Sequence, residues 1–493
     1  MTRAVHGNIR FILDSVKERY PNVPAISLPV IDLGNNDFEK DYQLKITSTD
    51  PCLIDKDGNL PQSTNQWLQN MVEDFSEFFM NEEEAASFAC GGYLVREMSE
   101  NLNVIVLNTV LWSTELDQHN QPKPEIDEQG FDFTDPQFDP FGMHTWLEVT
   151  LSSLRSQNKK VYITGHIPPV VMSFVEAIGE NLMYEHHVDR FYSTVSQYND
   201  VVSGIFFGHL HSNEIRRIPN NGNKNTPPLI ISGSMSPVYD SNPFFHVVTY
   251  DRDGSKFPLD LTSYSTDLEN VIRQPPPNDS FIQFQPIFSS FLDFFEMEVF
   301  TNAEVEKLAA KFIQEDINMD ESPADPQRKV WGPYWNQWYK GTPQIKCHDT
   351  CRVQEACTMT CGMTTESWKT CISNRPTIAN PDHNAPNMMN MCTLPSNVYT
   401  ESNTVLMSAV VNDDNVEVNP NSKVILYASV AALVSIIFLS FMCWACVSIA
   451  QFCQRKKRDL IPLDDINIDV NIDLDSTFSG NERSLDLRLP TIT

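Results

Sequence analysis

The pattern of apolar and polar positions in the first 255 residues predicts alternating strands and helices. Helices are predicted at 143–157 and 182–197, where apolar residues recur every three or four positions. Short apolar runs bounded by turn residues predict strands at 103–108, 160–164, 202–207, 229–232 and 245–250. This alternation is typical of a layered α/β domain, so we assign residues 1–255 to one such domain.

The chain changes character after residue 255. Residues 256–400 combine proline-rich turns, aromatic-rich helical segments and six cysteines, which predicts a helical subdomain held by disulfides. A polar, asparagine-rich stretch at 401–423 is typical of a stalk. The acidic tail at 451–493 has the composition of a disordered segment.

An apolar run occupies residues 424–450 and contains no formal charge. About 20 such residues suffice to cross a bilayer as a helix, so we predict one membrane span here. Four basic residues at 455–458 follow the run, whereas only Lys423 stands near its other end. The positive-inside bias then places the tail in the cytosol and the preceding domain in a lumen (lysosome or vacuole) or outside the cell.

Composition narrows the partners and the compartment. The formal net charge of −30 would repel nucleic-acid phosphates, which argues against a DNA or RNA partner. Eight of the eleven cysteines precede residue 424, and this even number predicts disulfides in an oxidising compartment. A zinc knuckle within 347–361 is the alternative, although the cysteine spacings there are not the pairs that structural zinc prefers.

Three loops share one design, in which a strand ends, a glycine follows, and a metal-type ligand comes next. They present Asn35 after Gly34, His166 after Gly165, and the pair His209 and His211 after Gly208. Loops at the strand ends of α/β sheets are common ligand sites, and neutral imidazole is a good ligand for borderline metals. One such loop is weak evidence, but three in one domain predict a metal centre.

With these loops in view, the sequence resembles the calcineurin-like metallophosphoesterases, in the branch that holds acid sphingomyelinases and endopolyphosphatases. The resemblance covers roughly residues 9–255. It rests on the stretches LGNND, GGYLVRE, NVIVLNT, DPFGMHTWLEVTL, KVYITGHIPP, FFGHLHSNE and SGSMSPVYDSNPFFHVVTYD. It implies a four-layer α/β/β/α core and hydrolysis of a phosphoric diester.

The resemblance also assigns roles to individual residues. It implies that Asn35, His166 and His209 bind one divalent metal and that His211 binds a second, with zinc ahead of manganese or iron. Asn36 stands where the family has a general-acid histidine, and a carboxamide cannot protonate a leaving group. GNND is similar to the endopolyphosphatase form of this motif. We expect a sphingomyelin-like substrate from the family resemblance, and Asn36 makes polyphosphate the alternative.

Two features of the family are not found before Asn35. These are its Asp-x-His and Gly-Asp-x-x-Asp motifs, which supply further ligands and the carboxylate that bridges the metals. No export signal is visible at the start of the chain either. We therefore expect that the sequence lacks an N-terminal segment. The alternative is a pseudo-phosphoesterase that serves as a membrane-tethered binding protein.

The remaining candidates carry less weight. His144 is a weak candidate for a substrate contact, and His186 and His187 fit the surface or the packing face of a helix. Glu214, after the histidine pair, fits a surface salt bridge better than support for a ligand. Asn278 opens an Asn-Asp-Ser sequon, which predicts glycosylation in a lumenal loop.

Overall fold

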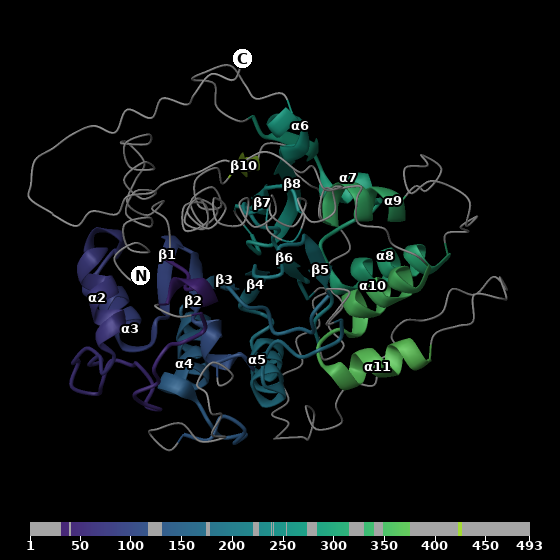
Figure 1. Ribbon diagram of the computed structural model, residues 1–493. Helices are drawn as coiled ribbons and strands as arrows, with labels where there is room; N and C mark the ends of the chain where they lie inside the picture. The colour runs from purple at the N-terminus through teal and green to yellow at the C-terminus, as the bar shows by residue number, and fades with distance from the viewer. Residues whose placement is uncertain are drawn as a thin grey trace, which may run out of the picture. The chain divides into compact units, whose positions relative to one another are not determined.

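A computed structural model describes residues 31–38, 41–116, 131–173, 178–219, 226–237, 239, 241–252, 254–273, 283–314, 330–339, 349–374 and 423–425 (Figure 1). All of these residues lie in the first of two compact units, residues 1–444. The second unit, residues 445–493, contains none of them.

The described residues contain a mixed sheet of six strands in the order β1-β2-β3-β4-β6-β5. Its strands are β1 (Leu94–Ser99), β2 (Leu102–Leu107), β3 (Lys160–Gly165), β4 (Val202–Phe207), β5 (Glu214–Arg216) and β6 (Leu229–Ile231). Strands β2, β3, β4 and β6 run parallel, while β1 and β5 pair antiparallel at the two edges. Parallel strands are usually covered on both faces, which explains why the central strands are almost continuously apolar.

A second, antiparallel sheet follows in the order β10-β7-β8-β9. Its strands are β7 (Phe244–Asp251), β8 (Pro258–Ser265), β9 (Gln285–Phe288) and β10 (Lys423–Ile425). Residues of β7 alternate between buried and half-buried, as expected where one face packs inward. The Tyr162 hydroxyl on β3 donates to the Lys256 carbonyl at 2.5 Å and ties the first sheet to the β7–β8 turn.

Helices flank the first sheet and are numerous after β8. The earlier ones are α2 (Gln66–Asp74), α3 (Glu82–Gly91), α4 (Met143–Ser156) and α5 (Glu185–Gln197), with short 3-10 turns η2 (Asn35–Asp37), η3 (Ser76–Phe78), η4 (Thr109–Trp112) and η5 (Pro140–Gly142). The later ones are α6 (Leu268–Arg273), α7 (Phe291–Phe295), α8 (Asn302–Gln314), α9 (Trp331–Pro333), the π-helical η6 (Tyr334–Tyr339), α10 (Asp349–Cys361) and α11 (Thr365–Ser373). Helices α8 and α10 contact edge strand β5, on the right of Figure 1.

The observed strands and helices confirm the α/β fold class and most of the strands and helices predicted from the sequence. The helix predicted at 143–157 is α4, and the one predicted at 182–197 begins later, at Glu185. The five predicted strands correspond to β2, β3, β4, β6 and β7. Strand β1 was missed because its sequence, LVREMS, carries charges where a fully buried strand would not.

Disulfides form as the cysteine pattern predicts. Cys52 is bonded to Cys90, and Cys357 to Cys371, which joins α10 to α11. Cys361 is disulfide-bonded as well. The zinc-knuckle alternative is therefore wrong for Cys357 and Cys361, because a sulfur in a disulfide cannot ligate zinc as a thiolate.

Four predictions fall outside the described residues. They are the sequon at Asn278, the stalk at 401–423 except for Lys423, the tail at 451–493, and the apolar run 424–450 except for its first two residues, which end β10. Among the helices that the structure describes, none combines the length and the apolar character that a bilayer span requires.

Candidate functional site

The candidate site lies where β3 and β4 end. These parallel strands pair Gly165 with Phe207, so the loops that follow leave the sheet side by side. His166 comes directly after β3, and His209 comes two residues after β4. The backbone N–H of Gly208 donates to the carbonyl of His166 at 3.0 Å, which fixes the two loops to each other.

Three of the predicted ligands converge here. Oδ1 of Asn35 lies 2.8 Å from Nε2 of His166, and that nitrogen lies 3.2 Å from Nδ1 of His209. The two imidazole rings meet edge to face, with centroids 5.0 Å apart. Residues separated by more than 130 positions in the sequence therefore present an oxygen and two nitrogens to one point.

Asn35 reaches this point because the residues around it hold it there. Its Nδ2 donates to Oδ1 of Asp41 at 2.7 Å, which turns the amide oxygen toward His166. The Asp37 carboxylate accepts from the backbone N–H of Gly34 at 2.7 Å and closes the turn. A Cβ on Gly34 would lie 3.2 Å from the His166 ring, so glycine permits the close approach.

His209 is oriented from its other nitrogen. The Tyr42 hydroxyl lies 3.3 Å from Nε2 of His209, and the two rings are nearly perpendicular. If Nε2 carries the proton and donates a hydrogen bond to the Tyr42 hydroxyl oxygen, the lone pair of Nδ1 faces His166 and Asn35. A metal-binding histidine is commonly fixed in this way by a partner on its second nitrogen.

Both converging imidazoles are neutral at physiological pH. Burial, aided by His211, lowers the pKa of His166 to about 3. Burial, with His166 and His211 nearby, holds the pKa of His209 well below its usual value. Neutral imidazole is the form that binds metals, because a protonated ring has no lone pair to give.

The other two predicted site residues are placed less centrally. His211 influences the pKa of both His166 and His209, and its ring meets the Tyr239 ring edge to face at 5.2 Å. Asn36 is exposed beside the buried Asn35. It is therefore accessible to a substrate.

The donor atoms of these side chains lie close enough together to suit a metal ion. No group of three or more His, Cys, Asp and Glu side chains in the described ranges is placed to hold one. The converging set includes an asparagine, however, and its separations of 2.8 and 3.2 Å suit ligands of a single ion. Two donors at about 2.1 Å from one ion lie about 3.0–3.4 Å apart for ordinary coordination angles. The 3.2 Å separation falls within this range, and the 2.8 Å separation would widen by about 0.2 Å on binding. Asn35, His166 and His209 therefore fit one borderline cation such as zinc.

Sequence reasoning missed the residues that orient these ligands. Asp41 and Tyr42 follow the GNND motif closely, but nothing in their spacing marks them. Asp37 could have been found, because an acidic residue three positions after Gly34 suits the first turn of a helix.

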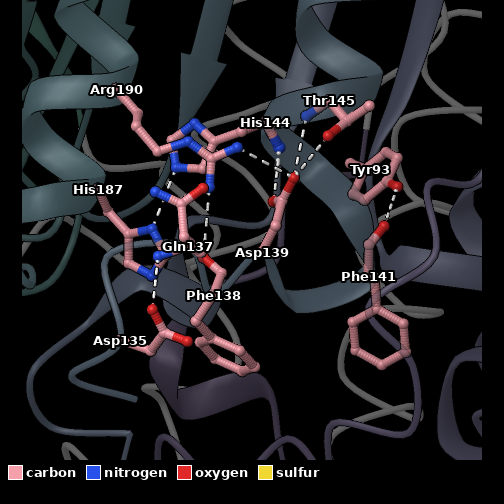
Figure 2. Close-up of polar contacts among 10 residues, drawn as sticks. All are labelled: Tyr93, Asp135, Gln137, Phe138, Asp139, Phe141, His144, Thr145, His187 and Arg190. Carbon is pink, nitrogen blue, oxygen red and sulfur yellow. Dashed lines mark hydrogen bonds and ion pairs between the residues drawn. The ribbon is translucent and has the colours of Figure 1, made fainter. Parts of the chain in front are cut away.

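His144 and His187 both pack in the interior (Figure 2), as the packing alternative for His187 predicted. Both rings are buried, and Nε2 of His144 lies 3.1 Å from Nδ1 of His187. His144 also stacks on Trp112 at 4.2 Å. His144 therefore contacts the interior rather than a substrate, and His187 is a core residue. His186, beside them, is partly exposed, as the sequence suggested.

The prediction of a surface salt bridge at Glu214 is wrong. It is fully buried on β5, where it accepts hydrogen bonds from Ser173 at 2.6 Å and from Nε of Arg216 at 2.8 Å. Its surroundings include Glu355 of α10. This is a buried ionic network between the sheet and the later helices rather than a surface salt bridge.

Comparisons with known proteins find relatives that match about half of the chain. No family model matches the chain. It is 31% identical over 253 residues to a sphingomyelinase phosphodiesterase D of Dictyostelium discoideum, which is 50% of this chain and 49% of that protein. It is 23% identical over 272 residues to a cyclic GMP-AMP phosphodiesterase of Bos taurus, which is 53% of this chain and 51% of that protein. It is 25% identical over 216 residues to a sphingomyelin phosphodiesterase B of Dictyostelium discoideum, which is 42% of this chain and 30% of that protein.

These relatives are acid sphingomyelinase-like phosphodiesterases, so the resemblance that the motifs indicated is confirmed. The chain spans about half the length of the first two relatives and less of the third.

Proposed function

We propose that this protein is a metal-dependent phosphoric diester hydrolase of the acid sphingomyelinase kind. The observation that carries the proposal is the convergence of Asn35, His166 and His209 on one point at the ends of β3 and β4. The relatives are named as phosphodiesterases, which supports the reaction class. A four-layer α/β/β/α core with its helical C-terminal part, stalk and single span belongs to the same proposal.

The residues of the site have distinct tasks. Asn35, His166 and His209 would hold one cation, and His211 a second. When bound, such a metal pair supplies a Lewis acid and a water of lowered pKa for attack on phosphorus. Tyr42 and Asp41 orient the ligands through hydrogen bonds. Asn36, which is exposed, can donate a hydrogen bond to a phosphate oxygen but cannot protonate a leaving group.

A sphingomyelin-like lipid is the substrate that the relatives favour most directly. Polyphosphate is a second candidate, favoured by Asn36, because its leaving group departs without a strong general acid. The disulfides support an oxidising compartment, and the apolar run 424–450 supports attachment of the domain to a membrane.

Hydrolysis assays of the full chain test the proposal. Wild-type protein and His209→Ala would be assayed with zinc or manganese on sphingomyelin vesicles, polyphosphate and cyclic GMP-AMP. Because the family motifs that supply the bridging carboxylate are not found before Asn35, we expect only slow turnover of a diester or phosphoanhydride by the wild type, and its loss in the variant. Equal activity in both would remove His209 from the site. Metal binding without turnover of any substrate would favour the pseudo-phosphoesterase.

A further inference from the structure

The loop that carries the histidine pair adopts an unfavourable backbone. His209 has φ +70° and His211 has φ +54°, in the left-handed region that residues with a Cβ seldom adopt. Such conformations persist where the surrounding structure determines them, and they concentrate at functional sites. On the N-terminal side, the loop is held by the bond from Gly208 to His166. A second anchor is therefore needed after His211.

Asn213 provides that anchor. Its side chain is fully buried, and its Oδ1 accepts from the backbone N–H of Gly233 at 2.6 Å and from Nε2 of His246 at 2.8 Å. Its Nδ2 donates to the carbonyl of Trp338 at 2.6 Å, and its backbone N–H donates to the carbonyl of Tyr339 at 2.8 Å. One residue thus joins the loop to β6, β7 and η6.

A directional chain of hydrogen bonds sets the orientation of the Asn213 amide. Nε1–H of Trp338 donates to the Ser263 hydroxyl at 3.1 Å, and that hydroxyl lies 2.9 Å from Nδ1 of His246. Ser263 can then donate to Nδ1, which leaves the proton of His246 on Nε2 to be donated to Asn213. In this series of hydrogen bonds each group acts as donor or acceptor in one direction, so the Asn213 amide has a single orientation.

The packing around Asn213 leaves no room for a second position of its amide. A Cβ on Gly233 would lie only 2.7 Å from Oδ1 of Asn213, so the amide fills the space up to the backbone. Trp338 and His246 are both buried, which keeps water from competing for these bonds.

We propose that Asn213 is a positioning residue for the metal site. It anchors the left-handed loop, and through it η6 fixes where His209 and His211 stand. This role rests on the proposed metal site. It also implies that the helices after β9 support the metal centre and do more than cover the sheet.

The test measures metal affinity directly. Co²⁺ would be titrated into the full chain and into Asn213→Ala, with visible absorption as the readout. We expect Asn213→Ala to weaken Co²⁺ binding at least tenfold and to change the absorption bands, as loss of outer supporting contacts commonly does. Asn213→Ser, which keeps a small hydroxyl and buries no charge, should fall between the two and serves if the alanine variant does not fold.

Asn302→Ala is the matched control. Asn302 is also buried, and its side chain bonds the backbone of Ile218 through Oδ1 at 3.1 Å and Nδ2 at 2.8 Å, away from the loop. It should lower the melting temperature but leave Co²⁺ affinity within about twofold of wild type. Wild-type affinity and spectrum in the Asn213 variants, or an equal loss in Asn302→Ala, would overturn the proposal. Failure of the wild type to bind Co²⁺ would instead reject the metal site itself.

Discussion

The hydroxyl of Tyr42 lies 3.3 Å from Nε2 of His209, on the side of the ring away from the Nδ1 that faces His166. Burial raises the pKa of Tyr42, so the phenol stays neutral across physiological pH. The neutral hydroxyl oxygen can accept a hydrogen bond from Nε2–H, and the lone pair of Nδ1 is then free to bind a cation. Tyr42 itself has φ +60°, and His209, His211 and Tyr239 of the same region also adopt the left-handed backbone.

Tyr42→Phe should therefore weaken metal binding while leaving the fold intact. The ring stays in place, but the imidazole loses the partner that fixes its tautomer, and we expect about tenfold weaker Zn²⁺ or Co²⁺ binding by calorimetry. Tyr93→Phe is the control, because the Tyr93 hydroxyl donates to the Phe141 carbonyl at 2.6 Å and has no contact with the ligands. Equal affinity of Tyr42→Phe and wild type would refute this role.

The sequence identified the converging side chains better than the residues that hold them in place. His166 and His209 follow apolar strands and glycines, and both the strand period and the turn residue can be recognised without a structure. Tyr42 and Asp41 act through contacts across the loop, and no periodicity or motif encodes such a contact. The same limit explains Glu214, because a charged residue near a strand end looks exposed until the helices that cover β5 are placed.

The fold shows a similar division. Strands such as β2 and β4 are short and largely apolar, so the pattern of residues alone identified them. Helix α5 begins three residues later than its apolar pattern, because Leu182 and Met183 are buried in the preceding turn. Burial of apolar residues in irregular chain is a tertiary effect, and helical spacing cannot report it.

Gly34→Ala should disturb the site by crowding. The new Cβ would lie 3.2 Å from Cε1 of His166 and 3.3 Å from its two ring nitrogens, so the ring must shift by a few tenths of an ångström. We expect several-fold weaker Co²⁺ binding and a shifted absorption spectrum. Gly58→Ala is the control. It strains the backbone of a turn at φ +83°, but its new Cβ has no atom within 4 Å. It should lower stability without altering the spectrum, and an identical effect of both substitutions would contradict the prediction.

Removal of the Cys52–Cys90 disulfide should destabilise the domain substantially. The bond closes a loop of 38 residues, and the chain-entropy estimate for that length is about 4 kcal/mol. The double variant Cys52→Ala/Cys90→Ala would be compared with wild type by urea denaturation. If the free energy of unfolding of the double variant were less than about 1 kcal/mol lower than that of wild type, the bond would add little to stability. Cys357→Ala/Cys371→Ala, whose loop is 14 residues, should lose less, at about 3 kcal/mol.

Glu355 makes the stability of the domain depend on pH. The residue is buried on α10, where it accepts from the Tyr334 hydroxyl at 2.7 Å. Burial, reinforced by the charge of Glu214, raises its pKa to about 7 from an ordinary value of 4.5. The folded state therefore keeps a proton that the unfolded chain releases as pH rises from about 4.5 to 7, so stability falls across this interval.

Glu355→Gln should remove this dependence. The amide keeps an acceptor for Tyr334 but cannot ionise, so the variant should gain stability relative to wild type as pH rises, by on the order of 2–3 kcal/mol between pH 5 and 8. The measurement is urea denaturation at both pH values. Glu269→Gln is the control, since its carboxylate is exposed and pairs with Arg273 within α6, and its difference from wild type should stay constant. Parallel curves for Glu355→Gln and wild type across this range would mean that the carboxyl is ionised in the folded protein. In that case Arg216 would have to balance two buried carboxylates, Glu214 and Glu355.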